Sequence, residues 1–245
     1  MPVITMSRQR GSMGSYVALE VARKLNLRYL DREIIQAVAQ EAGVEAETVE
    51  AIEEKAGRLA RTLHLLNLRP KLPATASASL REQESFEERV RALVDREGLS
   101  QEAAVARLES GAGPEYVSRP DYLDLVTSVI VEQAARGQAM IVGRGGQMIL
   151  RDRPGVLHVQ VNAKFETRVY NIIEREGVKW REAAHRARLA DEQRAGYMRR
   201  FYNVNWLDSG LYDLVINTDQ IPCEVAVDMT IAAAEAVEVA AQTER

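Results

Sequence analysis

Residues 3–18 read VITMSRQRGSMGSYVA and decide the fold class of this chain. The first four are apolar or β-branched, as in a short buried strand, and helical spacing of apolar residues begins at the end of the stretch. A strand, a glycine-containing turn and a helix start form an anion site, because the first helical turn offers free N–H groups and a positive dipole end. Gly11 and Gly14 allow positive φ and close approach to a phosphate. Arg8 and Arg10 add positive charge beside the turn.

The turn departs from the full phosphate-loop pattern G-x-x-x-x-G-K-[ST]. If Gly14 is the second glycine, the lysine position falls on Ser15 and the hydroxyl position on Tyr16. The chain has only five lysines, and none precedes Arg23. An arginine must therefore supply the charge if phosphoryl transfer occurs. A simple strand-to-helix turn, with serines that cap the helix, remains the alternative.

The composition is that of a globular protein with one large core. The chain has 245 residues, 46% of them hydrophobic, and a formal net charge of −4, which argues against a general nucleic-acid binder. Its single cysteine, Cys223, excludes an internal disulfide and a cysteine-based zinc site. Neither a secretion signal nor a membrane-spanning apolar run is visible, so we expect a cytoplasmic protein without membrane contact. The sequence leaves open whether two copies form a homodimer.

Further strand signals alternate with helical segments along the chain. These strands are predicted at 27–30, 139–142, 156–161 and 212–218. Alternation of this kind predicts an α/β fold, a five-stranded parallel sheet flanked by helices, in a single domain over residues 1–245.

Two segments depart from the simple alternation. Residues 45–118 carry several helical patterns and are predicted to form a helical insert. Residues 178–205 carry many arginines on helical spacing. Such a segment is either an exposed face or a lid that folds over phosphates.

Charged residues follow two of the predicted strands. Asp31 and Arg32 come after 27–30, and Arg144 stands in a Gly-Arg-Gly run directly after 139–142. Parallel sheets bind ligands at the carboxyl ends of their strands, so these side chains are binding-site candidates. The alternatives are a helix N-cap for Asp31 and a tight turn with a solvated arginine. His158 has no His or Cys nearby and is interpreted as a packed strand histidine.

In order and spacing, these segments resemble the cytidylate kinase-like family, relatives of nucleoside monophosphate kinases in the P-loop NTPase class. The resemblance covers most of the chain outside about 67–118. It is carried by residues 4–8 with Gly11, Ser12 and Gly14, then by 29–35, 141–146, 191–194 and 212–218.

The resemblance implies a P-loop kinase-like fold and phosphoryl transfer from ATP, with Mg²⁺, to a nucleoside monophosphate, CMP or dCMP. By position, Asp31, Arg32, Arg144 and Asp191 would bind the substrate. Arg8, Arg188 and Arg194 would act in catalysis. The donor phosphates would lie on Gly11, Ser12, Met13, Gly14, Ser15 and Tyr16.

The loop also departs from the family, whose members have Gly-Ser-Gly-Gly-Arg where this chain has Gly11-Ser-Met-Gly-Ser15. Met13 narrows the room beside the backbone, whereas the Ser15 hydroxyl is a candidate Mg²⁺ ligand. Loss of one cation could slow transfer by roughly two to three powers of ten. Two alternatives to a cytidylate-type kinase therefore stay open: a nucleotide-binding protein with little or no catalysis, and a kinase of another small acceptor.

Overall fold

The central element is a five-stranded, all-parallel sheet with strand order β2-β3-β1-β4-β5. We describe it from a computed structural model, which covers residues 2–42, 46, 91, 100–101 and 119–243. The strands are β1 Val3–Arg8, β2 Arg28–Leu30, β3 Ala139–Val142, β4 Val156–Asn162 and β5 Leu214–Asn217. Because β1 lies at the centre between β3 and β4, the turn that follows it opens at the middle of the carboxyl edge.

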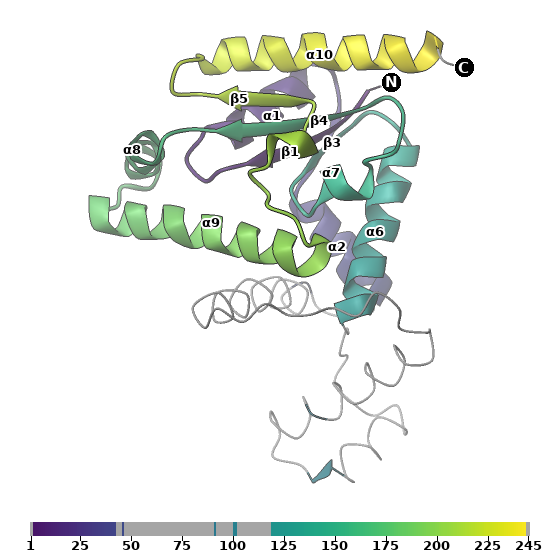
Figure 1. Cartoon of the computed structure of the whole chain (residues 1–245), viewed down its shortest axis with the longest axis horizontal. Coiled ribbons are helices and arrows are strands. Elements are labelled where there is room, and N and C mark those ends of the chain that lie inside the picture. Colours follow the sequence, from purple (N-terminus) through teal and green to yellow (C-terminus); the bar gives the residue numbers. More distant parts are fainter. Residues whose placement is uncertain (1, 43–45, 47–90, 92–99, 102–118, 244–245) are drawn as a thin grey trace.

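Helices cover both faces of the sheet (Figure 1). The helices are α1 Gly14–Lys24, α2 Arg32–Ala42, α6 Arg119–Ala135, α7 Gly146–Ile149, α8 Phe165–Glu176, α9 Trp180–Tyr202 and α10 Cys223–Thr243, with a 3₁₀ turn, η1, at Ser209–Leu211. α1 and α10 pack on one face, and α2 and α6 pack on the other. Among the described residues, no helix has the length and apolar character needed to cross a membrane.

The alternation of side chains along β1 explains the two layers. Ile4 and Met6 belong to the core beneath α1 and α10, whereas Val3 belongs to the core beneath α2 and α6. Successive residues of a strand face opposite sides of the sheet, so a strand buried on both faces must be apolar throughout. β3, with the sequence AMIV, is buried at every position for the same reason.

The predicted fold class is confirmed: five parallel strands form, each within two residues of the prediction at its start. The structure extends β1 to Arg8 and limits β5 to Leu214–Asn217. The predicted insert at 45–118 lies almost entirely outside the described residues. The predicted helix at the core of 178–205 is the continuous helix α9.

His158 is packed within the sheet, as the sequence predicts. The Thr5 Oγ1 lies 2.7 Å from its Nδ1, and the imidazole is buried. Burial lowers the pKa of His158 below its ordinary value, more than the nearby Asp213 raises it.

The lowered pKa of His158 predicts an acid-sensitive fold. In the unfolded chain, His158 has a pKa of about 6.5. As the pH falls below this value, His158 binds a proton in the unfolded chain but not in the folded protein, so the free energy of unfolding decreases. We expect the free energy of unfolding to drop between pH 7 and 5, by at most about 1.4 kcal/mol per pH unit from this group. Urea titrations of wild type and His158→Gln measure it, and the variant should show a flatter slope. Equal slopes would contradict this assignment.

Candidate functional site: two hollows at the carboxyl edge of the sheet

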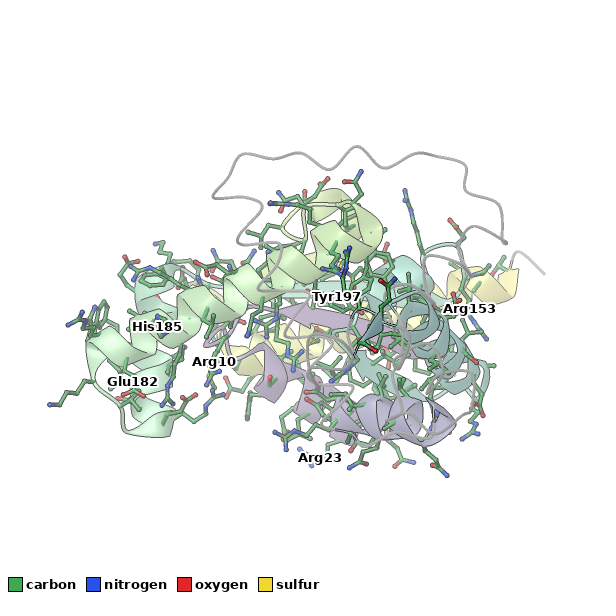
Figure 2. The ribbon with its side chains drawn as sticks, turned by 90° about the horizontal axis from the view of Figure 1, so that it is seen from below. Arg10, Arg23, Arg153, Glu182, His185 and Tyr197 are labelled. Carbon is green, nitrogen blue, oxygen red and sulfur yellow. The ribbon has the colours of Figure 1, made fainter. Side chains whose placement is uncertain are left out.

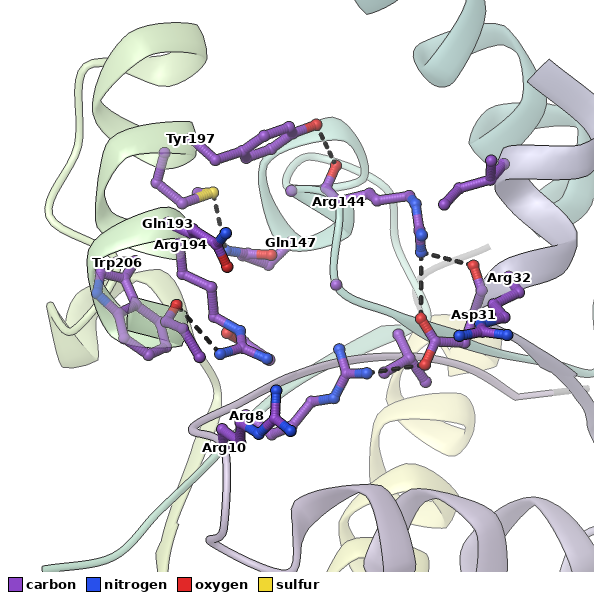
Figure 3. Close-up of a pocket in the computed structure, with 17 residues that line it drawn as sticks. Arg8, Arg10, Asp31, Arg32, Arg144, Gln147, Gln193, Arg194, Tyr197 and Trp206 are labelled. Carbon is purple, nitrogen blue, oxygen red and sulfur yellow. Dashed lines mark hydrogen bonds and ion pairs between the residues drawn. The ribbon is translucent and has the colours of Figure 1, made fainter. Parts of the chain in front are cut away.

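Two hollows open where β1, β2 and β3 end. The larger, about 420 Å³, is lined by residues that follow these strands and by residues of α9 (Figure 3). The smaller, about 190 Å³, lies over the turn between β1 and α1. Arg8, Arg10 and Arg194 line both hollows, so guanidinium groups stand at their junction.

The turn between β1 and α1 has the strand–turn–helix geometry that the sequence predicts. Gly11 has φ of +85°, and a Cβ built there would lie 2.4 Å from the Arg168 carbonyl oxygen. Met13 also takes a left-handed conformation, with φ of 60°, and its side chain stays 39% exposed at the rim of the smaller hollow. Gly14 differs from the prediction: it is not a positive-φ residue, and it is needed because a Cβ there would lie 2.6 Å from that of Arg8.

The hydroxyl groups of the turn have separate roles. The buried Ser12 hydroxyl lies 2.8 Å from the Gln9 carbonyl oxygen and 3.1 Å from that of Val161, so its one proton is shared between the turn and β4. The Ser15 hydroxyl is exposed in the first turn of α1, lines the smaller hollow, and accepts from Arg8 Nε at 3.3 Å. Tyr16 lies outside the lining of both hollows.

Asp31 joins two arginines on the floor of the larger hollow. Arg8 donates to its Oδ2 at 2.8 Å and Arg144 to its Oδ1 at 3.2 Å. Gly143, Arg144 and Gly145 have positive φ in succession, which costs free energy only at Arg144, and the turn directs the Arg144 side chain toward Asp31. Arg32 lines the same hollow, is exposed, and has no partner among the described residues.

Arg194 is a cation largely shielded from water at the junction of the two hollows. Its guanidinium donates a hydrogen bond to the Ala190 carbonyl oxygen at 3.3 Å and lies over the Trp206 ring. Burial, and then the neighbouring Arg8, lower the pKa of Arg194 to about 10. The group therefore stays charged at neutral pH without a carboxylate in ion-pair contact among the described residues, and an anion bound at the junction would relieve this.

α9 carries Glu182 and His185 toward the outer end of the molecule and Tyr197 nearer its middle (Figure 2). Near its C-terminal end, the Tyr197 hydroxyl donates to the Arg144 carbonyl oxygen, and the Tyr202 ring packs so closely on Gly145 that a Cβ there would lie 2.5 Å away. Burial raises the pKa of Tyr202 to about 12. Side chains of α9 therefore contact the turn that contains Arg144, and the same helix places Arg194 between the two hollows.

Asp191 and Arg188 lie outside both linings in this conformation. Asp191 forms an ion pair with the buried Arg168 at 2.9 Å, which fastens α9 to α8. Arg188 lies over the Phe165 ring, 4.6 Å from its centroid. The structure thus brings together Arg8, Asp31, Arg32, Arg144 and Arg194, but not these two.

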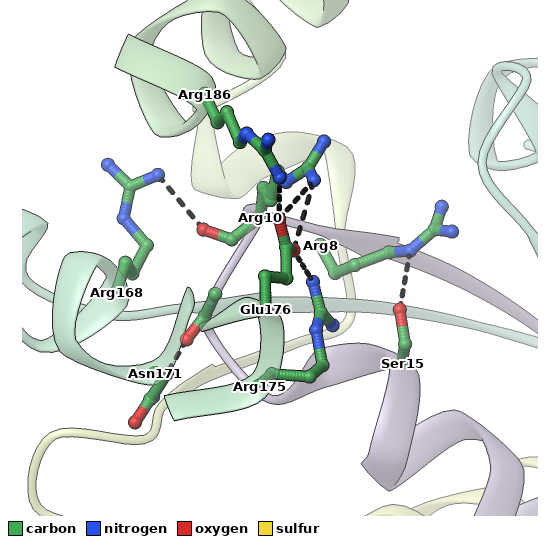
Figure 4. Close-up of polar contacts among 9 residues, drawn as sticks. Arg8, Arg10, Ser15, Arg168, Asn171, Arg175, Glu176 and Arg186 are labelled. Carbon is green, nitrogen blue, oxygen red and sulfur yellow. Dashed lines mark hydrogen bonds and ion pairs between the residues drawn. The ribbon is translucent and has the colours of Figure 1, made fainter. Parts of the chain in front are cut away.

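α8 contributes contacts to the turn that the sequence analysis did not single out (Figure 4). Arg168 contacts the Arg10 carbonyl oxygen and Asn171 donates to that of Gly11 at 2.8 Å, while Arg175 lines the smaller hollow. Their spacing of three and four residues puts them on one helix face. These polar residues on one face of a predicted helix were the sequence pattern that could have indicated the contacts with the turn.

Glu176, at the C-terminal end of α8, gathers three guanidinium groups. It accepts from Arg10 at 3.0 Å and from both Arg175 and Arg186 at 2.6 Å. The Arg175 hydrogen bond is the largest of the effects that lower the pKa of Glu176, followed by those of Arg186 and Arg10, and the value falls to about 2 despite partial burial. The carboxylate therefore holds Arg10 beside the turn at any physiological pH.

One solved structure superimposes on most of this chain and supports the fold. The solved structure of an uncharacterized protein from Eubacterium ventriosum superimposes with a TM-score of 0.61 at 18% identity, over 96% of this chain and 99% of that one. Shikimate kinase from Bacteroides thetaiotaomicron gives a TM-score of 0.44 at 13% identity, over 96% and 98% of the chains. The strand order and the turn after β1 are those of a P-loop kinase-like fold.

Two sequence comparisons bear on the family. Uronate isomerase of Corynebacterium glutamicum is 28% identical over 134 residues, a match that covers 55% of this chain and only a quarter (25%) of that protein. The sequence model of the cytidylate kinase-like family matches residues 3–220. That match contains every strand and both hollows, and the chain therefore belongs to the cytidylate kinase-like family.

Proposed function

We propose that this protein transfers the γ-phosphoryl group of ATP to a nucleoside monophosphate, CMP or dCMP. The family supports a nucleotide kinase-like function. One observation carries the proposal further: the smaller hollow, over the phosphate turn, and the larger one share Arg8, Arg10 and Arg194. A group that passes from one hollow to the other meets these three cations, and phosphoryl transfer depends on positioning and charge neutralisation.

In this proposal, the donor triphosphate binds the smaller hollow. The N-terminal turn of α1 supplies backbone N–H groups, and Arg8, Arg10 and Arg194 supply the positive charge that a loop lysine provides in the full motif. The acceptor phosphate binds Arg144, whose side chain already contacts a carboxylate, Asp31. Arg188 and Asp191 take part only if α9 shifts on nucleotide binding.

The residues present fit a Mg²⁺ ion that is bound mainly through phosphate. No cluster of three or more His, Cys, Asp or Glu side chains exists in the described part of the chain, and Mg²⁺ in kinases usually takes few protein ligands. The exposed Ser15 hydroxyl, beside the smaller hollow, is the oxygen we propose as its protein ligand. Bound there, the ion would neutralise charge on the phosphates.

Nucleotide binding without efficient transfer is the second candidate. It is favoured by the absence of an ammonium group in the turn and by the existing hydrogen bond between Arg8 and Ser15. An ADP-release assay with a panel of nucleoside monophosphates separates the candidates. Release that depends on CMP or dCMP supports the proposal. Calorimetric ATP binding with no acceptor-dependent release supports the second candidate and contradicts the first.

Arg144→Ala should weaken the acceptor site while the fold stays intact. Loss of a charge-assisted contact to phosphate costs about 1.5–3 kcal/mol, so we expect KM for the acceptor to rise about 10- to 100-fold. Arg151→Ala is the matched control, because Arg151 is exposed just beyond α7 and lies outside both linings. Initial rates at varied acceptor concentration measure the effect. Unchanged kinetics for Arg144→Ala would remove Arg144 from the acceptor site.

A further inference from the structure

A buried set of hydrogen bonds lies beneath the larger hollow. The Tyr212 hydroxyl donates to the Trp206 carbonyl oxygen at 2.7 Å, and Gln160 Nε2 donates to the same oxygen at 2.8 Å. A carbonyl oxygen has two lone pairs and no proton, so both of its sites are occupied. The direction of the Tyr212 O–H bond is therefore fixed toward Trp206.

This direction orients the Gln147 side-chain amide. Gln147 Nε2 lies 3.3 Å from the Tyr212 oxygen and 4.0 Å from the Met198 sulfur. Because the Tyr212 proton points to Trp206, the Tyr212 oxygen can only accept from Gln147. The reversed amide would set two oxygens against each other, so the network itself decides an orientation that is otherwise ambiguous.

The fixed amide leaves its oxygen for a ligand. Gln147 lines the larger hollow, and no residue in the described ranges donates to its Oε1. An acceptor held rigidly in a largely buried residue favours a ligand that brings a hydrogen-bond donor.

The surroundings of Oε1 suit the edge of a flat base. Trp206 and Met198 line the same hollow as Gln147, while the charged pair Asp31 and Arg144 lies elsewhere in the lining (Figure 3). Proteins recognise nucleobases partly through hydrogen bonds at the edge of the base. The phosphate and the base of one nucleotide can therefore bind at different parts of this hollow.

We propose that Gln147 is a specificity-determining residue that selects an acceptor base with an exocyclic amine over one with a carbonyl at that position. The proposal rests on the nucleoside monophosphate kinase function above. The amine of cytosine donates to Gln147 Oε1. The corresponding oxygen of uracil has no proton to give, so the two acceptors are left facing each other and CMP is preferred to UMP. Tyr212 is the positioning residue that prevents the amide from turning.

The size of the preference follows from the cost of an unpaired buried acceptor, about 1–3 kcal/mol, which corresponds to about 10- to 100-fold in affinity or kcat/KM. Gln147→Met keeps the length of the side chain and removes the acceptor. Tyr212→Phe keeps the ring and frees the amide to turn. Both should lower the CMP/UMP ratio about tenfold or more.

Gln160→Met is the matched control. It makes the same chemical change in the same network, yet Gln160 lies outside the lining of the hollow. We expect it to lower thermal stability about as much as Gln147→Met and to keep the CMP/UMP ratio of the wild type. If Gln147→Met does not fold, the CMP/UMP ratio of Tyr212→Phe tests the proposal.

The experiment measures Kd by calorimetry and kcat/KM by ADP release, for CMP, dCMP and UMP, with the full chain. A wild-type CMP/UMP ratio of about 10 or more, lost in both site variants, supports the proposal. A CMP/UMP ratio near one in the wild type, or an unchanged ratio in the variants, overturns the proposal without contradicting phosphoryl transfer. If Gln147→Met instead changes the CMP/dCMP ratio, Gln147 contacts the sugar and not the base, and this result also overturns the proposal. Absence of binding and of ADP release with every acceptor contradicts the proposed function as well.

Discussion

Arg194→Met should lower kcat about 100- to 1000-fold and leave the protein at least as stable as wild type. Arg194 lines both hollows, and an arginine at transferring phosphate contributes on this scale or more. Burial lowers its pKa to about 10, so the folded protein holds the charged guanidinium unfavourably, at a cost on the order of 3 kcal/mol. Replacing Arg194 by methionine removes this electrostatic cost. The gain in stability offsets the loss of the arginine's contact with the Trp206 ring.

Arg199→Met is the matched control for Arg194→Met. Arg199 is on the same helix, is exposed, and lines neither hollow, so the change should alter neither kcat nor stability measurably. Steady-state rates and urea titrations of both variants give the comparison. A kcat for Arg194→Met within about threefold of wild type would remove Arg194 from the reaction. A large loss of stability in that variant would show that its charge is structurally required.

Gly11→Ala should destabilise the protein by about 3 kcal/mol and abolish tight nucleotide binding. The added Cβ meets the Arg168 carbonyl oxygen at 2.4 Å, and φ is +85°. Left-handed backbone costs roughly 1–2 kcal/mol for a residue with a Cβ, and overpacking adds about 1–3 kcal/mol. Because the clash is with backbone, the turn itself must move, and the hollow above it changes shape.

Gly177→Ala separates these two contributions. Gly177 ends α8 with φ of +65°, and nothing lies within 4 Å of the added Cβ, so only the conformational cost of about 1–2 kcal/mol applies. Urea titration and calorimetry with ATP measure both variants. Gly177→Ala should bind ATP as wild type does. Equal destabilisation by the two changes would contradict the close packing of Gly11 on α8.

The sheet and half of the site were predictable from the sequence, because both depend on local patterns. Short apolar runs between helical segments identify buried strands, and parallel strands bring their carboxyl ends to one edge. That reasoning alone places Arg8, Asp31 and Arg144 together, and the structure joins them by two ion pairs.

The residues of α9 were harder to place, because a sequence does not show how a helix is rotated against its neighbours. Arg188 and Arg194 are six residues apart, so they point about 120° away from each other around the helix. The ion pair between Arg168 and Asp191 sets the rotation that turns Arg194 to the hollows and Arg188 to Phe165. Gln147 was missed for a similar reason, since its orientation depends on Tyr212, far away in the sequence.

A crystal structure with a non-hydrolysable ATP analogue and Mg²⁺ tests the proposed phosphate site most directly. We expect the β- and γ-phosphates in the smaller hollow over Gly11–Ser15, with guanidinium nitrogens of Arg8, Arg10 or Arg194 within hydrogen-bond distance of their oxygens. A triphosphate bound elsewhere, or a hollow filled by the Met13 side chain, would contradict the central claim that arginines replace the missing lysine.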